Sequence, residues 1–291
     1  MSSPSNAEGR QPHRRWAFFG GSFDPPHLGH LEVARAAQTA LALDAVLFAP
    51  VGEQPLKPQG STAAFAHRLA MTRLAIAGDP AFAVSLADTP QPSGAPNYTF
   101  ETLLTLRAQL PPDGVLFCLM GADSFAGLRR WHRAAEIPFV AHLIVASRPS
   151  ESLGNLDDLK AFLPDGLTLV GHGFGADPCP SDSLQDPPLA VKLHSESKLC
   201  QGTTSVVPQI RQNTRRALAP EKYSSLNAQI DLRRYTLRNP SGQQAPFYLL
   251  PGLDIDISAS NIRDQIRAQS PQRAQLPVTV SEYIRAHDLY L

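Results

Sequence analysis

The chain has 291 residues, and 43% of them are hydrophobic, so it can bury a core without disulfide bonds or structural metals. Its 26 Lys and Arg balance 26 Asp and Glu, which argues against general attraction to nucleic acid or to a membrane surface. The three cysteines lack a CxxC spacing, which disfavours a disulfide framework and a zinc site and favours a cytoplasmic location.

Strand and helix patterns alternate through the first half of the chain after a basic segment, 1–14, that we expect to be a disordered tail. The expected elements, in chain order, are strand 16–20, helix 28–43, strand 45–50, helix 63–77, strand 82–88, helix 99–109 and strands 114–121 and 139–149. The last two strands are almost continuously apolar, which indicates burial on both faces. We therefore predict an α/β fold, a Rossmann-like doubly wound parallel sheet with helices on both faces.

Composition changes between residues 150 and 246, where Pro, Ser, Gly, Asp and Gln cluster without a sustained period. We expect an insertion here, helical near 206–217 and 220–230 and otherwise disordered, that could serve oligomerisation or regulation. Order returns with a strand at 247–250 and helices at 257–268 and 276–291. The predicted division is a tail (1–14), one domain (15–149 with 247–291) and the insertion (150–246), and homo-oligomerisation stays open.

The stretch FFGGSFDPPHLGH, 18–30, leads from the first strand into the first helix. Gly20 and Gly21 allow a positive φ and a close approach of the backbone to a ligand, and the helix start adds free N–H groups and a positive dipole end. Such a place attracts phosphate. His27 and His30 are one turn apart and can both donate to phosphate oxygens. Taken singly, these features also fit a tight turn, a surface histidine pair or half of a metal site.

GGSFDPPHLGH closely resembles the signature of the HxGH nucleotidyltransferases, whose fold resembles that of class I aminoacyl-tRNA synthetases. The resemblance implies that His27 and His30 are catalytic, because the histidines of this motif contact the nucleotide phosphates and stabilise the α-phosphorus during adenylyl transfer. It also implies an ATP-binding turn made of Gly20, Gly21, Ser22 and Phe23.

ISASNIR, 257–263, resembles the ISxTxIR motif of the same superfamily, which binds the β- and γ-phosphates of ATP. The resemblance implies a catalytic role for Arg263 and ATP binding by Ser258 and Ser260, with Ser260 in place of the usual threonine. The serines can also cap the helix, and a plain capped surface helix is the alternative interpretation.

Four further segments resemble nicotinate-nucleotide adenylyltransferases. PNYTFETL (96–103) implies that Tyr98 and Thr99 lie beside a pyridine ring and its carboxylate, although Thr99 is also a plausible helix cap. MGADSFAGLRRWHRAAEI (120–137) implies Asp123 near the nucleotide ribose and Trp131 stacked on the pyridine, although a tryptophan is more often core. HLIVASRP (142–149) implies Arg148 near the substrate, and 276–291 resembles the terminal helix.

The resemblance covers 16–149 and 247–291 and departs in the loop 49–60. In this loop Lys57, whose position implies a ligand of ATP, matches the family pattern. Leu56 and Val51 occupy positions where the family usually has histidine and asparagine, respectively.

In the implied reaction, ATP with Mg²⁺ donates its adenylyl group to nicotinate mononucleotide. The products are deamido-NAD and pyrophosphate. The mononucleotide phosphate is already anionic, so the reaction needs no general base, and catalysis consists of positioning and charge neutralisation. Asp24 is then expected to orient the cation or the histidines. Nicotinamide mononucleotide, phosphopantetheine and a cytidylyl acceptor are rival substrates, and a non-catalytic regulatory protein working through 150–246 is the rival of another class.

Overall fold

The computed structural model describes residues 14–56, 59–147, 156–173, 232–251, 253, 257–270 and 275–291. Its strands are β1 (Arg15–Gly21), β2 (Ala45–Pro50), β3 (Phe82–Val84), β4 (Val115–Gly121), β5 (His142–Ala146), β6 (Thr168–Gly173), β7 (Arg233–Arg238) and β8 (Gln244–Leu250). Its α-helices are α1 (Leu28–Ala40), α2 (Phe65–Ile76), α3 (Thr99–Arg107), α4 (Ala122–Ala126), α5 (Ile137–Val140), α6 (Leu156–Phe162), α7 (Ala259–Arg267) and α8 (Val278–Ala286). Leu128–Arg130 and Ala134–Glu136 form short 3₁₀ turns.

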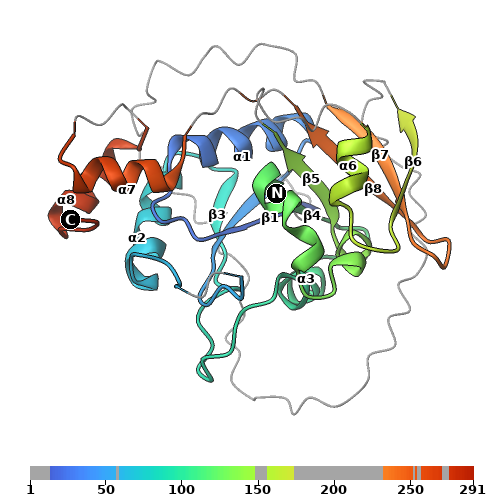
Figure 1. The fold of residues 1–291 in the computed structure, drawn as a ribbon, viewed down its shortest axis with the longest axis horizontal. Helices are drawn as coiled ribbons and strands as arrows, with labels where there is room; N and C mark the ends of the chain where they lie inside the picture. Colours follow the sequence, from blue (N-terminus) through green and yellow to red (C-terminus); the bar gives the residue numbers. More distant parts are fainter. Residues whose placement is uncertain are drawn as a thin grey trace, which may run out of the picture.

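All eight strands belong to one sheet in the order β3-β2-β1-β4-β5-β8-β7-β6 (Figure 1). The strands from β3 to β8 in this order run parallel, and β7 is antiparallel to both β8 and β6. From β1 the chain builds outward to β2 and β3, and then returns to the other side of β1 with β4. This reversal creates a crevice at the carboxyl ends of β1 and β4, the usual ligand position in such sheets. The predicted doubly wound α/β fold is confirmed.

Helices cover both faces of the sheet because successive side chains of a strand point to opposite faces. In β1, Trp16 and Phe18 pack into a cluster with residues of α3, α4, α5 and α6. Ala17 and Phe19 pack into a second cluster, with α1 and Ile76 of α2. A third cluster joins α2 to the C-terminal helices α7 and α8. The last part of the chain therefore lies against the helix that follows β2.

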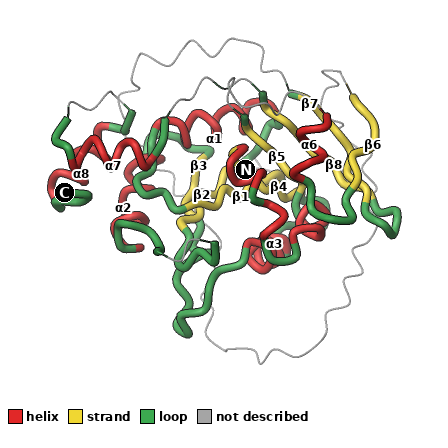
Figure 2. The backbone as a smooth tube through the Cα atoms, viewed as in Figure 1, coloured by secondary structure: helices red, strands yellow, loops and turns green. Residues whose placement is uncertain are grey.

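The elements expected from the sequence are found with small shifts at their ends (Figure 2). Two strands are shorter than expected. β3 ends at Val84, and β5 begins at His142, because the preceding apolar residues form α5. Within the described ranges, none of the helices has the length and apolarity needed to cross a bilayer.

The range 150–246 contributes three elements that the sequence analysis did not expect. Helix α6 packs on the sheet through the fully buried Leu159, and β6 and β7 extend the sheet beyond β8. Polar residues alternate with Tyr235 and Leu237 in β7, so the strand lacks the continuous apolar run used to recognise the other strands. The helices expected near 206–217 and 220–230, and residues 1–13, lie outside the described residues.

Candidate active site

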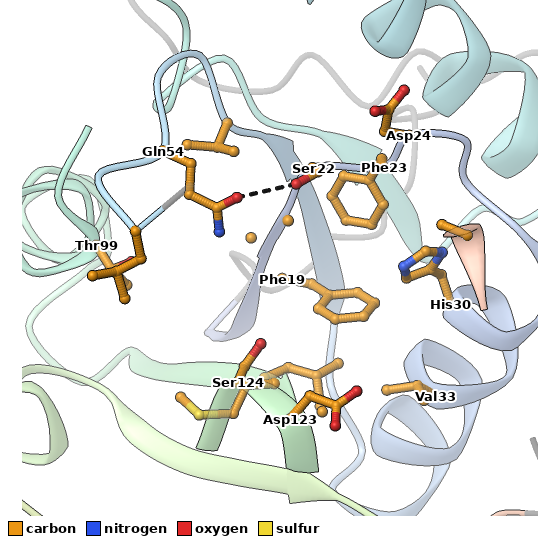
Figure 3. A pocket seen from close by; sticks show the side chains of 18 of the residues that line it. Phe19, Ser22, Phe23, Asp24, His30, Val33, Gln54, Thr99, Asp123 and Ser124 are labelled. Carbon is orange, nitrogen blue, oxygen red and sulfur yellow. Dashed lines mark hydrogen bonds between the residues drawn. The ribbon is translucent and has the colours of Figure 1, made fainter. Parts of the chain in front are cut away.

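A cavity of about 610 Å³ opens at the carboxyl ends of β1, β4 and β5 (Figure 3). Most of the residues singled out in the sequence line it: Gly20, Gly21, Ser22, Phe23, His27, His30, Tyr98, Thr99, Asp123, Trp131, Ser258, Ser260 and Arg263. Lys57 and Arg148 lie outside the described residues. Segments far apart in the sequence thus meet around one space. We call the side formed by 20–30 and 258–263 the histidine wall, and the side formed by Tyr98, Thr99, Trp131 and His132 the aromatic wall.

The turn after β1 differs in detail from the expectation. Gly20 and Gly21 are part of the strand, and the residue with a positive φ, 47°, is Phe23. Gly20 is needed for another reason, since a Cβ atom there would lie 2.6 Å from the ring of Phe18. The buried Phe23 ring packs against Phe19 and His30. The turn therefore brings an aromatic side chain against the histidine pair.

The two histidines form a stacked pair at the start of α1. Their ring centroids are 3.7 Å apart, and the backbone N–H of His27 donates to Nδ1 of His30 over 3.2 Å. Because Nδ1 accepts this bond, a neutral His30 carries its proton on Nε2, which makes that nitrogen the donor for a ligand. Burial, and then the charge of His27, hold the pKa of His30 well below its usual range. His30 is therefore neutral at pH 7 when the cavity holds no anion.

Arg263 reaches the same turn from the start of α7. Its guanidinium donates to the backbone oxygen of Asp24 over 2.7 Å and to the hydroxyl of Ser260 over 3.2 Å. Ser258 occupies the N-cap position of α7, but its side chain makes no capping hydrogen bond, contrary to the capping interpretation. The Ser258 hydroxyl lines the cavity and can instead turn toward a ligand.

The histidine wall rests on two buried charged groups. The carboxylate of Asp24 accepts hydrogen bonds from the backbone N–H groups of Thr62 and Ala63 and from the hydroxyl of Tyr290, at 2.6, 3.1 and 2.8 Å. Asp24 is thus a structural anchor, and the expectation that it orients a cation or the histidines does not describe these contacts. Burial, and then Asp24, raise the pKa of Tyr290 above its usual range, so its hydroxyl stays protonated and donates.

Arg68 of α2 is the second buried charge and is only 2% exposed. Its guanidinium donates to the backbone oxygens of Ser22, Val51 and Ala63, at 2.7, 2.8 and 3.1 Å. One side chain therefore joins the turns that follow β1 and β2 to the start of α2. Sequence reasoning missed this role, because an arginine in a helix is usually on the surface.

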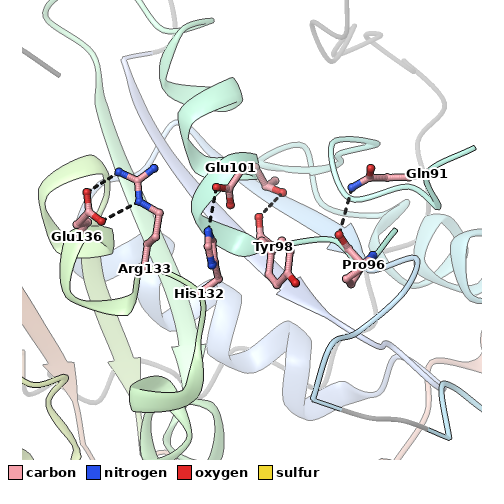
Figure 4. Close-up of polar contacts among 8 residues, drawn as sticks. Gln91, Pro96, Tyr98, Glu101, His132, Arg133 and Glu136 are labelled. Carbon is pink, nitrogen blue, oxygen red and sulfur yellow. Dashed lines mark hydrogen bonds and ion pairs between the residues drawn. The ribbon is translucent and has the colours of Figure 1, made fainter. Parts of the chain in front are cut away.

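The aromatic wall is more exposed. Tyr98 is 39% exposed, and its ring lies 4.7 Å from the ring of His132, which pairs with Glu101 over 3.4 Å (Figure 4). Trp131 is half-buried and packs on the core while it also lines the cavity, so its two interpretations are compatible. Thr99 is the first residue of α3 and Tyr98 is its N-cap residue, so the capping alternative for Thr99 is wrong.

Beneath the aromatic wall lies a second buried acid, Asp88, which accepts a hydrogen bond from the Thr102 hydroxyl. Burial raises the pKa of Asp88 to about 6 against the opposing effect of this bond. Burial, helped by Asp88, also raises the pKa of Cys118 to about 12, so Cys118 stays a neutral thiol. Both residues line the cavity. Below pH 6, therefore, the Cys118 thiol is neutral and the Asp88 carboxyl is mostly protonated, so these two groups carry little charge.

Asn97 ties the aromatic wall to the loop after β2. Its side-chain oxygen accepts from the backbone N–H of Glu53 over 3.1 Å, and its amide donates to the backbone oxygen of Thr89 over 2.9 Å. Gly52 allows the two loops to meet, since a Cβ atom there would lie 2.5 Å from the backbone of Pro90. The loop with the Val51 and Leu56 departures is therefore fixed at one end, and both of these residues line the cavity.

A cavity at the switch point of a doubly wound sheet, with a histidine pair at a helix start, defines a nucleotide-binding α/β protein. Residues 18–265 match the family model described as cytidylyltransferase-like. A protein of Roseiflexus castenholzii named as a probable nicotinate-nucleotide adenylyltransferase is 44% identical over 150 residues, which are 52% of this chain and 73% of the relative. One of Trichlorobacter lovleyi with the same name is 41% identical over 162 residues, 54% and 75% of the two chains.

These matches establish that the chain belongs to the cytidylyltransferase-like family and, within it, to the nicotinate-nucleotide adenylyltransferases. The fold is also that of the Plasmodium falciparum nicotinic acid mononucleotide adenylyltransferase complexed with NaAD, with a TM-score of 0.56 at 12% identity. That similarity covers 96% of this chain and 98% of the other.

Proposed function

We propose that the protein transfers the adenylyl group of ATP to nicotinate mononucleotide and releases pyrophosphate and deamido-NAD. The observation that carries this proposal is the meeting of the histidine pair, Arg263 and the aromatic wall around one cavity. In the reaction, a phosphate oxygen of the mononucleotide attacks the α-phosphorus of ATP in line. The bond from the α-phosphorus to the bridging oxygen breaks, and its electron pair leaves with pyrophosphate.

The histidine wall is proposed to hold the triphosphate. His27 and the Nε2 of His30 donate to oxygens at the α-phosphorus, where charge changes during the reaction. Arg263 and Ser258 bind the outer phosphates, and Arg263 is oriented for this by its bond to the Asp24 backbone oxygen. His30 needs no added charge for this role, because its neutral form already carries the donor proton on Nε2 while Nδ1 accepts from the His27 backbone N–H.

Mg²⁺ is proposed to enter as part of the ATP complex. Among the described residues no three or more His, Cys, Asp or Glu side chains gather as a metal site. Phosphate oxygens of ATP would hold the cation, and Asp123, an exposed carboxylate on the cavity wall, could add a ligand. The chemistry that Mg²⁺ supplies is neutralisation of charge on the phosphates.

The aromatic wall is proposed to hold the acceptor. The rings of Tyr98 and Trp131 offer a flat apolar surface to a pyridine ring, with Thr99 beside it. Asp123 is proposed to bind ATP, by accepting from the ribose hydroxyls of the nucleotide. Lys57 and Arg148 are proposed as further ligands of ATP and of the substrate. With the ring on this wall, the mononucleotide phosphate points across the cavity toward the histidine pair.

The test is pyrophosphate release from ATP and Mg²⁺ with nicotinate mononucleotide, run beside nicotinamide mononucleotide and phosphopantetheine. We expect turnover on the nicotinate substrate and a decrease in kcat of roughly 10²- to 10³-fold in His27→Ala, the size typical of losing one donor to a developing charge. His287→Ala is the matched control, because His287 is an exposed histidine of the terminal segment that does not line the cavity. Absence of turnover on all three acceptors would contradict the proposal.

A further inference from the structure

One cation of the cavity has no partner in the described part of the chain. Arg130 lines the cavity, and its guanidinium makes no hydrogen bond or ion pair with any described residue. Arg263, the other described arginine that lines the cavity, donates to a backbone oxygen. Two further arginines that do not line the cavity are also engaged: Arg68 donates to backbone oxygens, and Arg133 forms a bidentate pair with Glu136 (Figure 4). An unpaired guanidinium in a concave site is suited to an anionic group of a ligand.

The position of Arg130 in the fold places it at the aromatic end of the cavity. It ends the 3₁₀ turn after α4 and directly precedes Trp131. Its guanidinium folds back over this turn, where a Cβ atom on Gly127 would lie 3.2 Å from it. The neighbouring His132 of the aromatic wall contacts Glu101, with 3.4 Å between its Nε2 and a carboxylate oxygen. Among the described residues, Arg130 is therefore an uncompensated positive charge beside the aromatic wall.

We propose that Arg130 binds the pyridine carboxylate of the acceptor and so favours the acid over the amide mononucleotide. This inference rests on the proposed function. The phosphate and the pyridine lie at opposite ends of the mononucleotide, and in-line attack requires the phosphate to reach the α-phosphorus beside the histidine pair. In Figure 3, His30 and Thr99 lie on opposite sides of the cavity. The ring end then lies beside Tyr98 and Trp131, next to Arg130, which pairs with its carboxylate through two parallel N–H groups.

The experiment compares Arg130→Gln with wild type on nicotinate and nicotinamide mononucleotide, by kcat/KM and by calorimetric binding of each mononucleotide. We expect a decrease of roughly tenfold to a hundredfold for the acid, as for a lost charged hydrogen-bonded pair, and less than about threefold for the amide. The KM for ATP should stay unchanged. Arg130→Lys, which keeps the charge but not the paired donors, should fall between wild type and Arg130→Gln for the acid.

Arg129→Gln is the matched control. This neighbouring arginine does not line the cavity, donates to the Leu163 backbone oxygen over 2.6 Å and lies 3.7 Å from Asp165. It should leave the ratio of acid to amide unchanged. An equal loss on both mononucleotides in Arg130→Gln, or no loss on either, would overturn the inference.

The failure of this inference and that of the proposed function are distinguishable. A wild-type protein that turns over the acid, while Arg130→Gln keeps the same acid preference, contradicts only the role of Arg130. A wild-type protein without turnover contradicts the proposed reaction, and the calorimetric preference for the acid mononucleotide still tests Arg130.

Discussion

The buried acids behind the two walls of the cavity differ in the number of hydrogen bonds that their carboxylates accept. Behind the histidine wall, Asp24 accepts three hydrogen bonds and lies near the positive charge of Arg68, which itself donates to three backbone oxygens. Beneath the aromatic wall, Asp88 has one hydrogen-bond donor, the Thr102 hydroxyl, among the described residues, and its pKa rises to about 6. A buried carboxylate with a single neutral donor is poorly compensated for the loss of water, so burial favours its protonated form.

This difference suits the two halves of the proposed reaction. The histidine wall must hold backbone groups and side chains in fixed positions against a highly charged triphosphate, and buried ionic contacts give that rigidity. The aromatic wall, which is proposed to hold the flat ring of the acceptor, is more exposed, and Arg130 lies exposed beside it in the cavity. On this proposal, it is the side of the cavity that selects the acceptor.

The largest effect is expected from Arg68→Met, which removes the guanidinium but keeps most of the apolar stem. Three backbone oxygens then lose their donor and Asp24 loses its buried counter-charge, so the free energy of unfolding should fall by about 3–5 kcal/mol. Urea denaturation measures this change. Arg73→Met is the control, because Arg73 is an exposed arginine of the same helix and its replacement should cost within about 0.5 kcal/mol. A loss in Arg68→Met as small as in the control would show that the histidine wall does not depend on this charge.

A smaller effect of opposite sign is expected from Asp88→Asn. The folded-state pKa of about 6 lies above the unfolded value, so between these values the folded state holds a proton that the unfolded state has lost. Wild-type stability therefore falls as the pH rises from about 4 to about 6 and stays lower above that range. Asparagine does not ionise, and it should raise the free energy of unfolding at pH 8 by at most about 3 kcal/mol.

Denaturation of wild type and Asp88→Asn at pH 5 and pH 8 measures this difference, and the gain should be smaller at pH 5. Asp113→Asn is the control, because Asp113 is half-exposed and pairs with the exposed Arg14. If Asp88→Asn destabilised the protein at pH 8 as much as at pH 5, burial would not raise the pKa of Asp88, and the comparison between the walls would fail.

The smallest effect is expected from Tyr290→Phe, which removes one of the three donors to Asp24 without creating a large cavity. Loss of a hydrogen bond to a buried carboxylate should lower the free energy of unfolding by about 1–2 kcal/mol. Because Asp24 fixes the turn that Arg263 contacts, kcat should fall as well, by less than in His27→Ala.

Tyr283→Phe separates the effects on stability and catalysis. The Tyr283 hydroxyl bonds Nδ1 of His67 over 3.0 Å, away from the cavity, so this variant should lose some stability and keep kcat. An unchanged kcat in Tyr290→Phe would limit the role of the C-terminal segment to folding.

Local sequence patterns predicted most of the fold and many of the residues around the site. The alternation of apolar runs with helical periods predicted the doubly wound sheet, since strand and helix periods are properties of consecutive residues. The block 18–30 predicted the position of the histidine pair for the same reason, because its strand, turn and helix start are contiguous. β6 and β7 were not predicted, since their alternating or short patterns gain meaning only once β8 offers an edge to pair with.

The class of fold and the positions of the motifs could therefore be predicted, because both are encoded within short windows of the chain. The contacts among distant residues arise only when the chain folds: Tyr290 with Asp24, Arg68 with Ser22, and the unpaired state of Arg130 in the cavity. The intrinsic helix propensity of an arginine is the same at every helix position. Whether its side chain is buried, paired or free depends on which elements pack around it. For that physical reason the anchors of the histidine wall and the proposed selectivity of the aromatic wall could not be derived from the sequence.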